Sequence, residues 1–415
     1  MRSSTSFLNR ISVFLITSLL FLPGCASVKA GPAAAGPVVG ANFRVAVYPV
    51  ANLSGARAPL KETRRMLTEM LRAKGMAVLS DEELETFLAR HRIRYLGGLS
   101  AEESEWMKGE MAVDAVLITS FEHYDEVFPP KIALTARLVS TGIKPVILWG
   151  GSSALAGDDS EGILALGLIE DPGRLLEKAV GGLSDSLTGY LSGKEERLKG
   201  ASWRAVVRRG TEETGQGPPF YFTAEAEGGR VHIGPFGPKS YYEAPFLAPG
   251  KRYSIVVAPF LNASADRDAG DIVRLQFVAQ LAAIKNISVV EPGVLREKML
   301  TSRIIMLDSV SLADADLIFE GLNADLILTG KVEDYYDYQG PNGTPHVRFS
   351  VSLIERKGGR MVWTSDSSNT GDDRVVIFDF GKIRTAQGLA SRMIRVIVEE
   401  LFSGPLIQER PKGVS

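Results

Sequence analysis

The stretch "VAVYPVANLS", residues 45–54, decides the fold because it occurs twice in the chain. Residues 255–264 read "IVVAPFLNAS", which keeps the pattern apolar-x-Val-x-Pro-apolar-x-Asn-x-Ser. Three further segments repeat in the same order: "AVDAVLITSFEHY" (112–124) with "NADLILTGKVEDY" (323–335), "IALTARLVS" (132–140) with "VRFSVSLIE" (347–355), and "VILWGGSS" (146–153) with "RMVWTSDSS" (360–368). Four ordered matches separated by 210 to 215 residues indicate an internal duplication.

Each copy has a recognisable order of strands and helices. A Val-rich strand ends at Pro49, and apolar residues at helical spacing over 64–74 predict a helix that ends before Gly75. Ser80 and Ser100 each precede Glu by three residues, which is the capping-box pattern of a helix start. Three strands and a closing helix are expected over 112–121, 131–140, 146–155 and 175–187. The predicted fold class is α/β: two tandem repeats of a β-α-β-α-α-β-β-β-α sandwich with a mixed sheet.

The amino terminus has the features of an export signal. Arg2 and Arg10 precede about a dozen mostly apolar residues, a run too short to span a bilayer. The following "LPGC", residues 22–25, resembles the bacterial lipobox, which implies cleavage before Cys25 and lipidation of that residue. Secretion without a lipid and an uncleaved anchor are the alternatives.

The expected domain organisation follows from the signal, the repeats and the composition between them. The segment 28–40 is rich in Ala, Gly and Pro, and the segment 201–250 is dense in Gly, Pro and aromatic residues. The predicted boundaries are a signal peptide at 1–24, a flexible tether at 25–41, a first domain at 42–198, a structured linker at 199–250, a second domain at 251–404 and a carboxy-terminal tail at 405–415.

Composition restricts the partners and the compartment. Cys25 is the only cysteine, so no intramolecular disulfide can form in an oxidising compartment. The formal net charge is −2 and no long basic block occurs, which argues against nucleic-acid binding. Ala26 and Ser27 lack the Asp that tends to retain lipoproteins in the inner membrane. The expected location is therefore the outer membrane, with a palmitate-type acyl anchor on Cys25 and the protein facing the periplasm.

Each repeat resembles one group of bacterial envelope proteins. The pattern of "VAVYPVANLS", a helix and a late "DAVLITSFE" strand is similar to the curli-secretion lipoprotein CsgG, the TolB amino-terminal domain and the lipoproteins that stimulate peptidoglycan synthases. The resemblance implies a compact α/β domain that binds other proteins and has no shared catalytic residues. CsgG forms a pore by extending strand hairpins. The hairpin loops expected here, at 122–131 and 333–346, are short, charged and broken by Pro.

No motif predicts catalysis, a metal or a cofactor. The four histidines, His91, His123, His232 and His346, lack metal-ligand spacing, and His123 and His346 are expected in solvated loops. The acidic clusters "GDDSEG" (157–162) and "GDDR" (371–374) are typical of polar turns, although a cation or partner site is an alternative. We therefore expect no catalytic residue, no metal site and no cofactor, and the protein is not predicted to be an enzyme.

Aromatic residues are the candidate partner contacts. Tyrosine is enriched at protein interfaces, and five tyrosines lie in the second hairpin and the linker. These candidates are Tyr335, Tyr336, Tyr338, Tyr241 and Tyr242. By contrast, Trp149 and Trp363 are expected in equivalent core sites, and Asn52 and Asn262 are expected to form Asx-turns.

Together these features predict a periplasmic lipoprotein of the outer membrane that acts as a protein-binding adaptor or assembly factor of an envelope or secretion machine. The envelope partner itself is unknown, and a homo-oligomer is left open. The main alternative is an oligomeric component of a CsgG-like outer-membrane secretion channel. An envelope enzyme is the third interpretation.

Overall fold

The structure is a computed structural model of the whole chain. It describes residues 43–159, 167–192, 236–243, 251–284, 286–305, 310–340, 343–373, 375 and 381–403. The predicted signal peptide, Cys25, the tether, most of the linker and the carboxy-terminal tail lie outside the described residues. Residues 36–415 form one compact unit, which contains both repeats.

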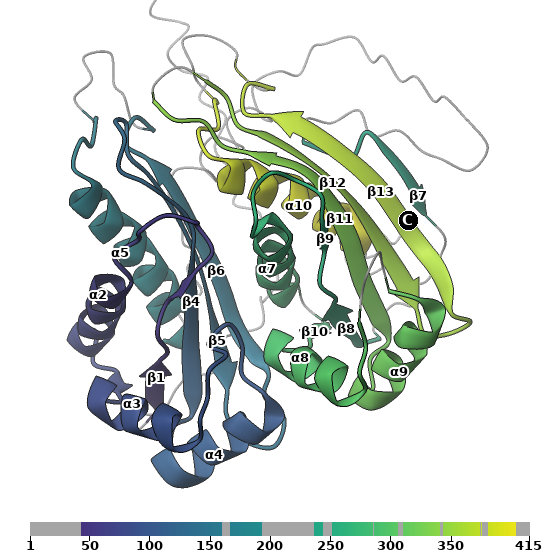
Figure 1. Cartoon of the computed structure of the whole chain (residues 1–415), viewed down its shortest axis with the longest axis horizontal. Coiled ribbons are helices and arrows are strands. Elements are labelled where there is room, and N and C mark those ends of the chain that lie inside the picture. The colour runs from purple at the N-terminus through teal and green to yellow at the C-terminus, as the bar shows by residue number, and fades with distance from the viewer. Residues whose placement is uncertain are drawn as a thin grey trace, which may run out of the picture. The chain divides into compact units, whose positions relative to one another are not determined.

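The two repeats have the same order of elements (Figure 1). The first comprises β1 (Arg44–Val47), β2 (Ala51–Asn52), α2 (Leu60–Ala73), β3 (Ala77–Val78), α3 (Asp81–Arg90), α4 (Ala101–Met111), β4 (Ala115–Asp125), β5 (Lys131–Ser140), β6 (Ile147–Ala156) and α5 (Pro172–Leu191). The second comprises β8 (Tyr253–Val257), β9 (Leu261–Asn262), α7 (Ala269–Ala282), β10 (Ile287–Val289), α8 (Pro292–Thr301), α9 (Leu312–Leu322), β11 (Leu326–Tyr336), β12 (His346–Glu355), β13 (Arg360–Thr370) and α10 (Ala386–Ser403). The duplicated β-α-β-α-α-β-β-β-α order is confirmed.

The sheets share one strand order. The first sheet runs β3-β1-β4-β5-β6 and the second runs β10-β8-β11-β12-β13, with β1–β3, β1–β4 and their counterparts parallel and the last three strands antiparallel. One strand, β7 (Ser240–Glu243), extends the second sheet by pairing antiparallel with β13. This strand comes from the predicted linker, so part of that linker belongs to the second sheet.

Irregularities in the strands also coincide. The β4–β5 register shifts between Phe121 and His123, and the β11–β12 register shifts between Val332 and Asp334. Both shifts leave a glutamate, Glu122 or Glu333, as the extra residue of a β-bulge. Shared bulges at equivalent positions support a duplication of the whole domain, because bulges are inherited features of a sheet.

Local sequence signals account for the helix ends. Ser80 and Ser100 both form complete capping boxes, with Glu83 and Glu103 as the reciprocal partners. The helices α4 and α9 end at Ala112 and Asn323, which both adopt the left-handed conformation. The starts of α3 and α4 are those that Ser80 and Ser100 predict, while α2 starts four residues earlier than the predicted helix.

Each sheet carries helices on both faces. Residues of α2 and α5 pack on one face of the first sheet, and α3 and α4 cover part of the other face. In the second repeat, α7 and α10 take the place of α2 and α5, and α8 and α9 cover part of the opposite face. Trp149 and Trp363 are buried, as expected.

The helix α7 lies between the two sheets (Figure 1). It contacts β8, β9 and β11 of its own repeat, and also β5 and β6 of the first repeat. Eleven of its fourteen residues are buried. A helix that is buried on all sides needs apolar residues around its whole circumference, and the sequence "AGDIVRLQFVAQLA" meets that need.

Candidate functional site

The five candidate tyrosines divide according to the alternation of the strands. Successive strand residues point to opposite faces, so adjacent tyrosines separate. Tyr335 is buried in the core, and Tyr241 stacks on Trp363 with ring centroids 4.8 Å apart. Tyr336 and Tyr242 instead remain 57% and 41% exposed. Partner contact therefore stays a prediction for these two residues, whereas burial argues against it for Tyr335.

Tyr338 has a structural role between the repeats. It is 5% exposed, and the ammonium of Lys131 lies 3.2 Å from the centre of its ring. Lys131 Nζ also donates to the Tyr338 carbonyl at 2.5 Å and pairs with Asp337 at 3.3 Å. Burial lowers the pKa of Lys131, and Asp337 offsets part of that shift. Tyr338 is thus occupied by a cation from the first repeat.

Tyr336 and Tyr242 share one surface of the second sheet, which we call the open strand face. The strand registers place on it the side chains that alternate away from α7 and α10. Its members are polar or aromatic and none is buried: Lys331, Asp334, Tyr336, His346, Arg348, Ser350, Ser352, Thr364, Asp366, Ser368, Ser240 and Tyr242.

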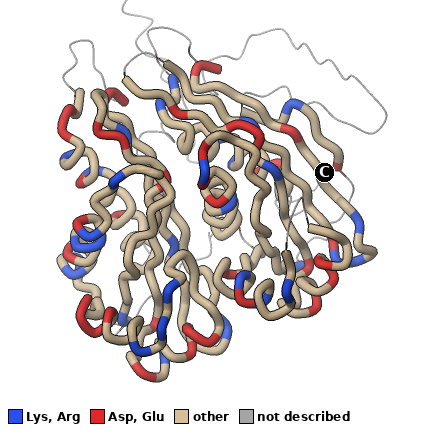
Figure 2. Tube along the Cα trace, viewed as in Figure 1, with Lys and Arg blue, Asp and Glu red and all other residues tan. Residues whose placement is uncertain are grey.

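The charges of the open strand face pair with one another. Arg348 Nε lies 2.8 Å from the carboxylate of Glu333, at the bulge, and 3.8 Å from that of Asp366. His346 Nδ1 lies 2.7 Å from Asp334. Residues of both charge signs are scattered along the second sheet (Figure 2). The face therefore presents mixed charge together with two exposed tyrosine rings.

The equivalent surface of the first sheet, which we call the covered strand face, lies under the second repeat. Gln276 of α7 donates from Nε2 to Glu122 at 2.6 Å and to Thr135 at 2.7 Å. Gly150 of β6 lies so close to α7 that a Cβ built on it would be 3.0 Å from the Cα of Ala279. A glycine at this position permits the helix to approach the strand.

Glu122 is the most perturbed acid of the covered strand face. Burial raises the pKa of Glu122 to about 7, and neutral hydrogen-bonding side chains around it, among them Gln276, offset part of the shift. No basic side chain neutralises it in that set. A carboxyl buried among neutral groups holds its proton, so Glu122 titrates near neutral pH instead of acting as a fixed charge.

A second buried contact joins β5 to the start of α8. The guanidinium of Arg137 forms a bidentate pair with Glu291, with two N···O distances of 3.0 Å. Glu291 also accepts from the backbone amide of Leu99 at 3.1 Å and caps α8 through Gly293. Because Glu291 has no exposed surface, this pair fixes the relative register of the repeats.

The acidic clusters are turns that also serve the junction. Gly157 and Gly371 sit where a Cβ would lie 2.2 Å from the carbonyl oxygens of Ile169 and Ile383. Asp159 accepts from the backbone amide of Ala156, and Asp373 accepts from that of Thr370. The polar-turn interpretation is thus confirmed for residues 157–159 and 371–373, and the other residues of the two clusters lie outside the described part.

The remaining acid of the first cluster, Asp158, reaches the second repeat. It forms a buried ion pair with Arg384 at 2.6 Å. Arg384 occupies the position that Glu170 has in the first repeat, since Ile169 and Ile383 make the same backbone bond to Gly157 and Gly371. Among the described residues, the repeat junction thus pairs Lys131 with Asp337, Arg137 with Glu291 and Arg384 with Asp158, and His123 also lies 3.9 Å from Asp337.

The expected loop positions of two histidines were wrong. His123 lies in β4 and His346 begins β12, because both hairpins continue their strands closer to the turn than the Pro residues suggested. Among the described residues, no group of three or more His, Cys, Asp or Glu is arranged to hold a metal ion. The described helices include none with the length and apolarity to cross a membrane.

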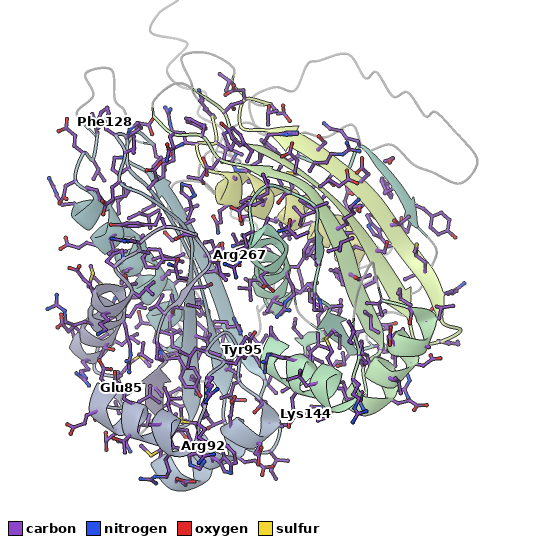
Figure 3. All side chains as sticks on the ribbon, viewed as in Figure 1. Glu85, Arg92, Tyr95, Phe128, Lys144 and Arg267 are labelled. Atoms are coloured by element: carbon purple, nitrogen blue, oxygen red, sulfur yellow. The ribbon has the colours of Figure 1, made fainter. Side chains whose placement is uncertain are left out.

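The side chains labelled in Figure 3 lie in several parts of the two repeats. Tyr95 lies near α8, where the guanidinium of Arg296 is 4.4 Å from its ring centre. Phe128, by contrast, is 49% exposed in the β4–β5 turn. Arg64, which pairs with Glu85 at 3.1 Å, lies within the first repeat.

Sequence reasoning identified the turns and the core tryptophans, but not the junction. Its contacts link residues that lie far apart in the chain, for example 141 positions for Thr135 and Gln276 and 206 for Lys131 and Asp337, and no local pattern encodes such pairs. One signal was available: α7 lacks a polar face, although its counterpart α2 has one.

Comparison with known proteins gives no sequence relative. The chain matches no protein-family model, and it matches no curated protein. The predicted CsgG and TolB relationship therefore has no support at the level of sequence.

Solved structures show distant similarity. The PelC dodecamer from Paraburkholderia phytofirmans is 21% identical, with 40% of this chain and 96% of that chain covered and a TM-score of 0.26. Lipoprotein GNA1162 from Neisseria meningitidis is 20% identical over 35% and 98% of the two chains, with a TM-score of 0.26. The LpoB carboxy-terminal domain from Escherichia coli is 15% identical over 29% and 87%, with a TM-score of 0.22. Scores this low do not define the function or assembly of this chain.

Proposed function

We propose that the protein is a lipoprotein anchored in the outer membrane and facing the periplasm, where it acts as a protein-binding adaptor or assembly factor. The observation that most supports this proposal is the contrast between the two strand faces. The same surface is covered by helices in the first repeat and open to solvent in the second. The helices α7 and α10 cover this surface in the first repeat, which supports an interaction surface at the same place in the second repeat.

The composition of the open strand face fits a protein partner. Its charges are of both signs and already paired, which suits a reversible contact with another polar surface. Tyr336 and Tyr242 supply exposed aromatic area, and tyrosine is enriched in interfaces. From the β13 register, these residues lie about 20 Å apart along the strands, a span that a helix pair can cover.

Photocrosslinking tests the adaptor function. The benzophenone amino acid p-benzoylphenylalanine replaces Tyr336 or Tyr242 in separate variants, and the control variant carries it at exposed Phe128. Irradiation of cells is expected to give one discrete envelope-protein adduct from both strand positions and none from Phe128. Adducts that are equal at all three positions, or absent from both strand positions, would contradict a partner at this face.

Acyl labelling tests the anchor independently. Cells grown with an alkyne fatty acid should incorporate the label into the wild type but not into a Cys25→Ser variant. The label should fractionate with outer membranes. Labelling of Cys25→Ser, or an unlabelled wild type, would remove the lipoprotein part of the proposal while leaving the photocrosslinking result intact.

A further inference from the structure

The equivalent helices α2 and α7 differ on their outer sides. Both bury one side against their own sheet, and Leu67 and Phe277 occupy the same position in that buried side. The outer positions are mostly charged and solvent-facing in α2, whereas in α7 they are covered and all but Gln276 are apolar. They are Glu62, Arg65, Met66 and Glu69 in α2, and Ile272, Leu275, Gln276 and Ala279 in α7. Only the helix of the second repeat is therefore suited to cover a strand face.

The equivalent strand faces differ in the complementary way. Gly150, which lets α7 approach β6, is replaced by Thr364 in β13. Ser120 of the covered strand face is replaced by Lys331, whose side chain is 43% exposed. The helix α2 of another copy could not approach β13 as α7 approaches β6, because Thr364 fills the space that Gly150 leaves free.

Suppose that a second chain docked on the open strand face in the way that the second repeat docks on the covered strand face. Two carboxylates would then be brought together. Inside the chain, Asp158 pairs with Arg384. Between two chains in the same arrangement, Asp372 of one would face Glu170 of the next, since these are the equivalent positions. The attraction between Asp158 and Arg384 would become a repulsion. Glu69 of the second chain would also take the place that Ala279 has against β6, and would face β13.

We propose that the two repeats form a closed head-to-tail pair within one chain. The second repeat is the partner of the covered strand face, and the residues at both outer ends prevent another copy from adding in the same way. A head-to-tail contact is heterologous, so without such blocks it would propagate into rings or filaments. Divergence of the two repeats confines the contact to the inside of one polypeptide.

Sedimentation velocity tests this inference on the full chain without its lipid. A Cys25→Ser variant at 1 to 100 µM is expected to sediment as a single chain throughout that range. In the same background, a Thr135→Cys and Gln276→Cys pair is expected to form an intramolecular disulfide on oxidation, because these positions are in contact. The equivalent pair, Met66→Cys and Ser350→Cys, is expected to give no cross-linked dimer.

A variant designed to gain association between chains tests the same inference from the opposite direction. The changes Glu69→Ala, Glu170→Arg and Thr364→Gly restore the apolar contact, the ion pair and the close approach. This variant is expected to associate with rising concentration, and the Met66–Ser350 cysteine pair should then cross-link between chains. Circular dichroism verifies that the variant is folded, and all three changed residues lie on the surface or at an exposed strand.

Two outcomes would overturn the closed pair. One is a cross-link between chains in the Met66→Cys and Ser350→Cys variant that carries none of the three gain-of-function changes. The other is a folded triple variant that stays a single chain at 100 µM. The closed pair does not require a partner at the open strand face, so photocrosslinking can fail without affecting it.

Discussion

Replacing Glu122 by Gln should make folding stability less dependent on pH. The pKa of Glu122 rises from its usual 4.5 to about 7, mainly through burial. Because the folded-state pKa is raised, the stabilising contribution is complete below pH 4.5 and is lost as the pH rises through 7. Each pKa unit corresponds to about 1.4 kcal/mol, so ionisation of Glu122 costs the fold about 3 kcal/mol by pH 8. The Gln side chain has the same shape and no such cost.

Urea unfolding at pH 5 and pH 8 measures this effect. We expect the free energy of unfolding of Glu122→Gln, relative to the wild type, to rise by about 2 to 3 kcal/mol between these two pH values, since part of the cost is already present at pH 5. Other acids also titrate in this range, including Asp159, whose pKa burial raises to about 6. Comparison with the wild type at each pH cancels their contribution.

Glu333→Gln is the matched control. Glu333 occupies the equivalent bulge in the second sheet, but its side chain is 31% exposed. The free energy of unfolding of this variant relative to the wild type should change by no more than about 0.5 kcal/mol between the two pH values. A difference for Glu122→Gln that is constant from pH 5 to pH 8 would refute the buried, proton-holding carboxyl.

Other substitutions test the packing of the fold by denaturant unfolding. Gly157→Ala should cost about 2 kcal/mol because its Cβ would meet the Ile169 carbonyl, whereas Gly181→Ala on the open side of α5 should gain about 0.5–1 kcal/mol. An equal loss in both would contradict the steric argument. Arg137→Met should cost about 3–5 kcal/mol by stranding the Glu291 carboxylate, and adding Glu291→Leu should recover only part of it, because the bonds from Leu99 and Gly293 to Glu291 are lost as well. No recovery would show that the pair itself stabilises the junction. Ser100→Ala should cost about 1 kcal/mol, and a neutral result would deny the capping box.

The order of elements was predictable because it depends on local patterns. Alternating apolar residues, Ser–Glu caps and Gly after a helix each act over a few positions, and the duplication supplied every pattern twice. The Asx-turns show the same: Asn52 and Asn262 each accept from the amide two residues on, at 3.1 and 3.0 Å.

The candidate site was predictable only in part. Tyrosine content suggested a contact surface, but adjacent tyrosines on a strand must face opposite ways, so only one of Tyr335 and Tyr336 can be exposed. The junction depends on pairs such as Arg137 with Glu291, which lie 154 residues apart. An Arg and a Glu at such distance carry no sequence signal of their pairing, so only the fold reveals it.

The location of α10 at the end of the described chain has a consequence for biogenesis. The first repeat is synthesised first. Part of its sheet is covered only by α7 and α10, which are synthesised more than a hundred residues later. Until those helices arrive, a polar and partly apolar strand surface stays exposed, which is the type of surface that holding chaperones protect. A ribosome that stalls before codon 386 would therefore release a chain without α10, and quality-control proteases should remove this chain.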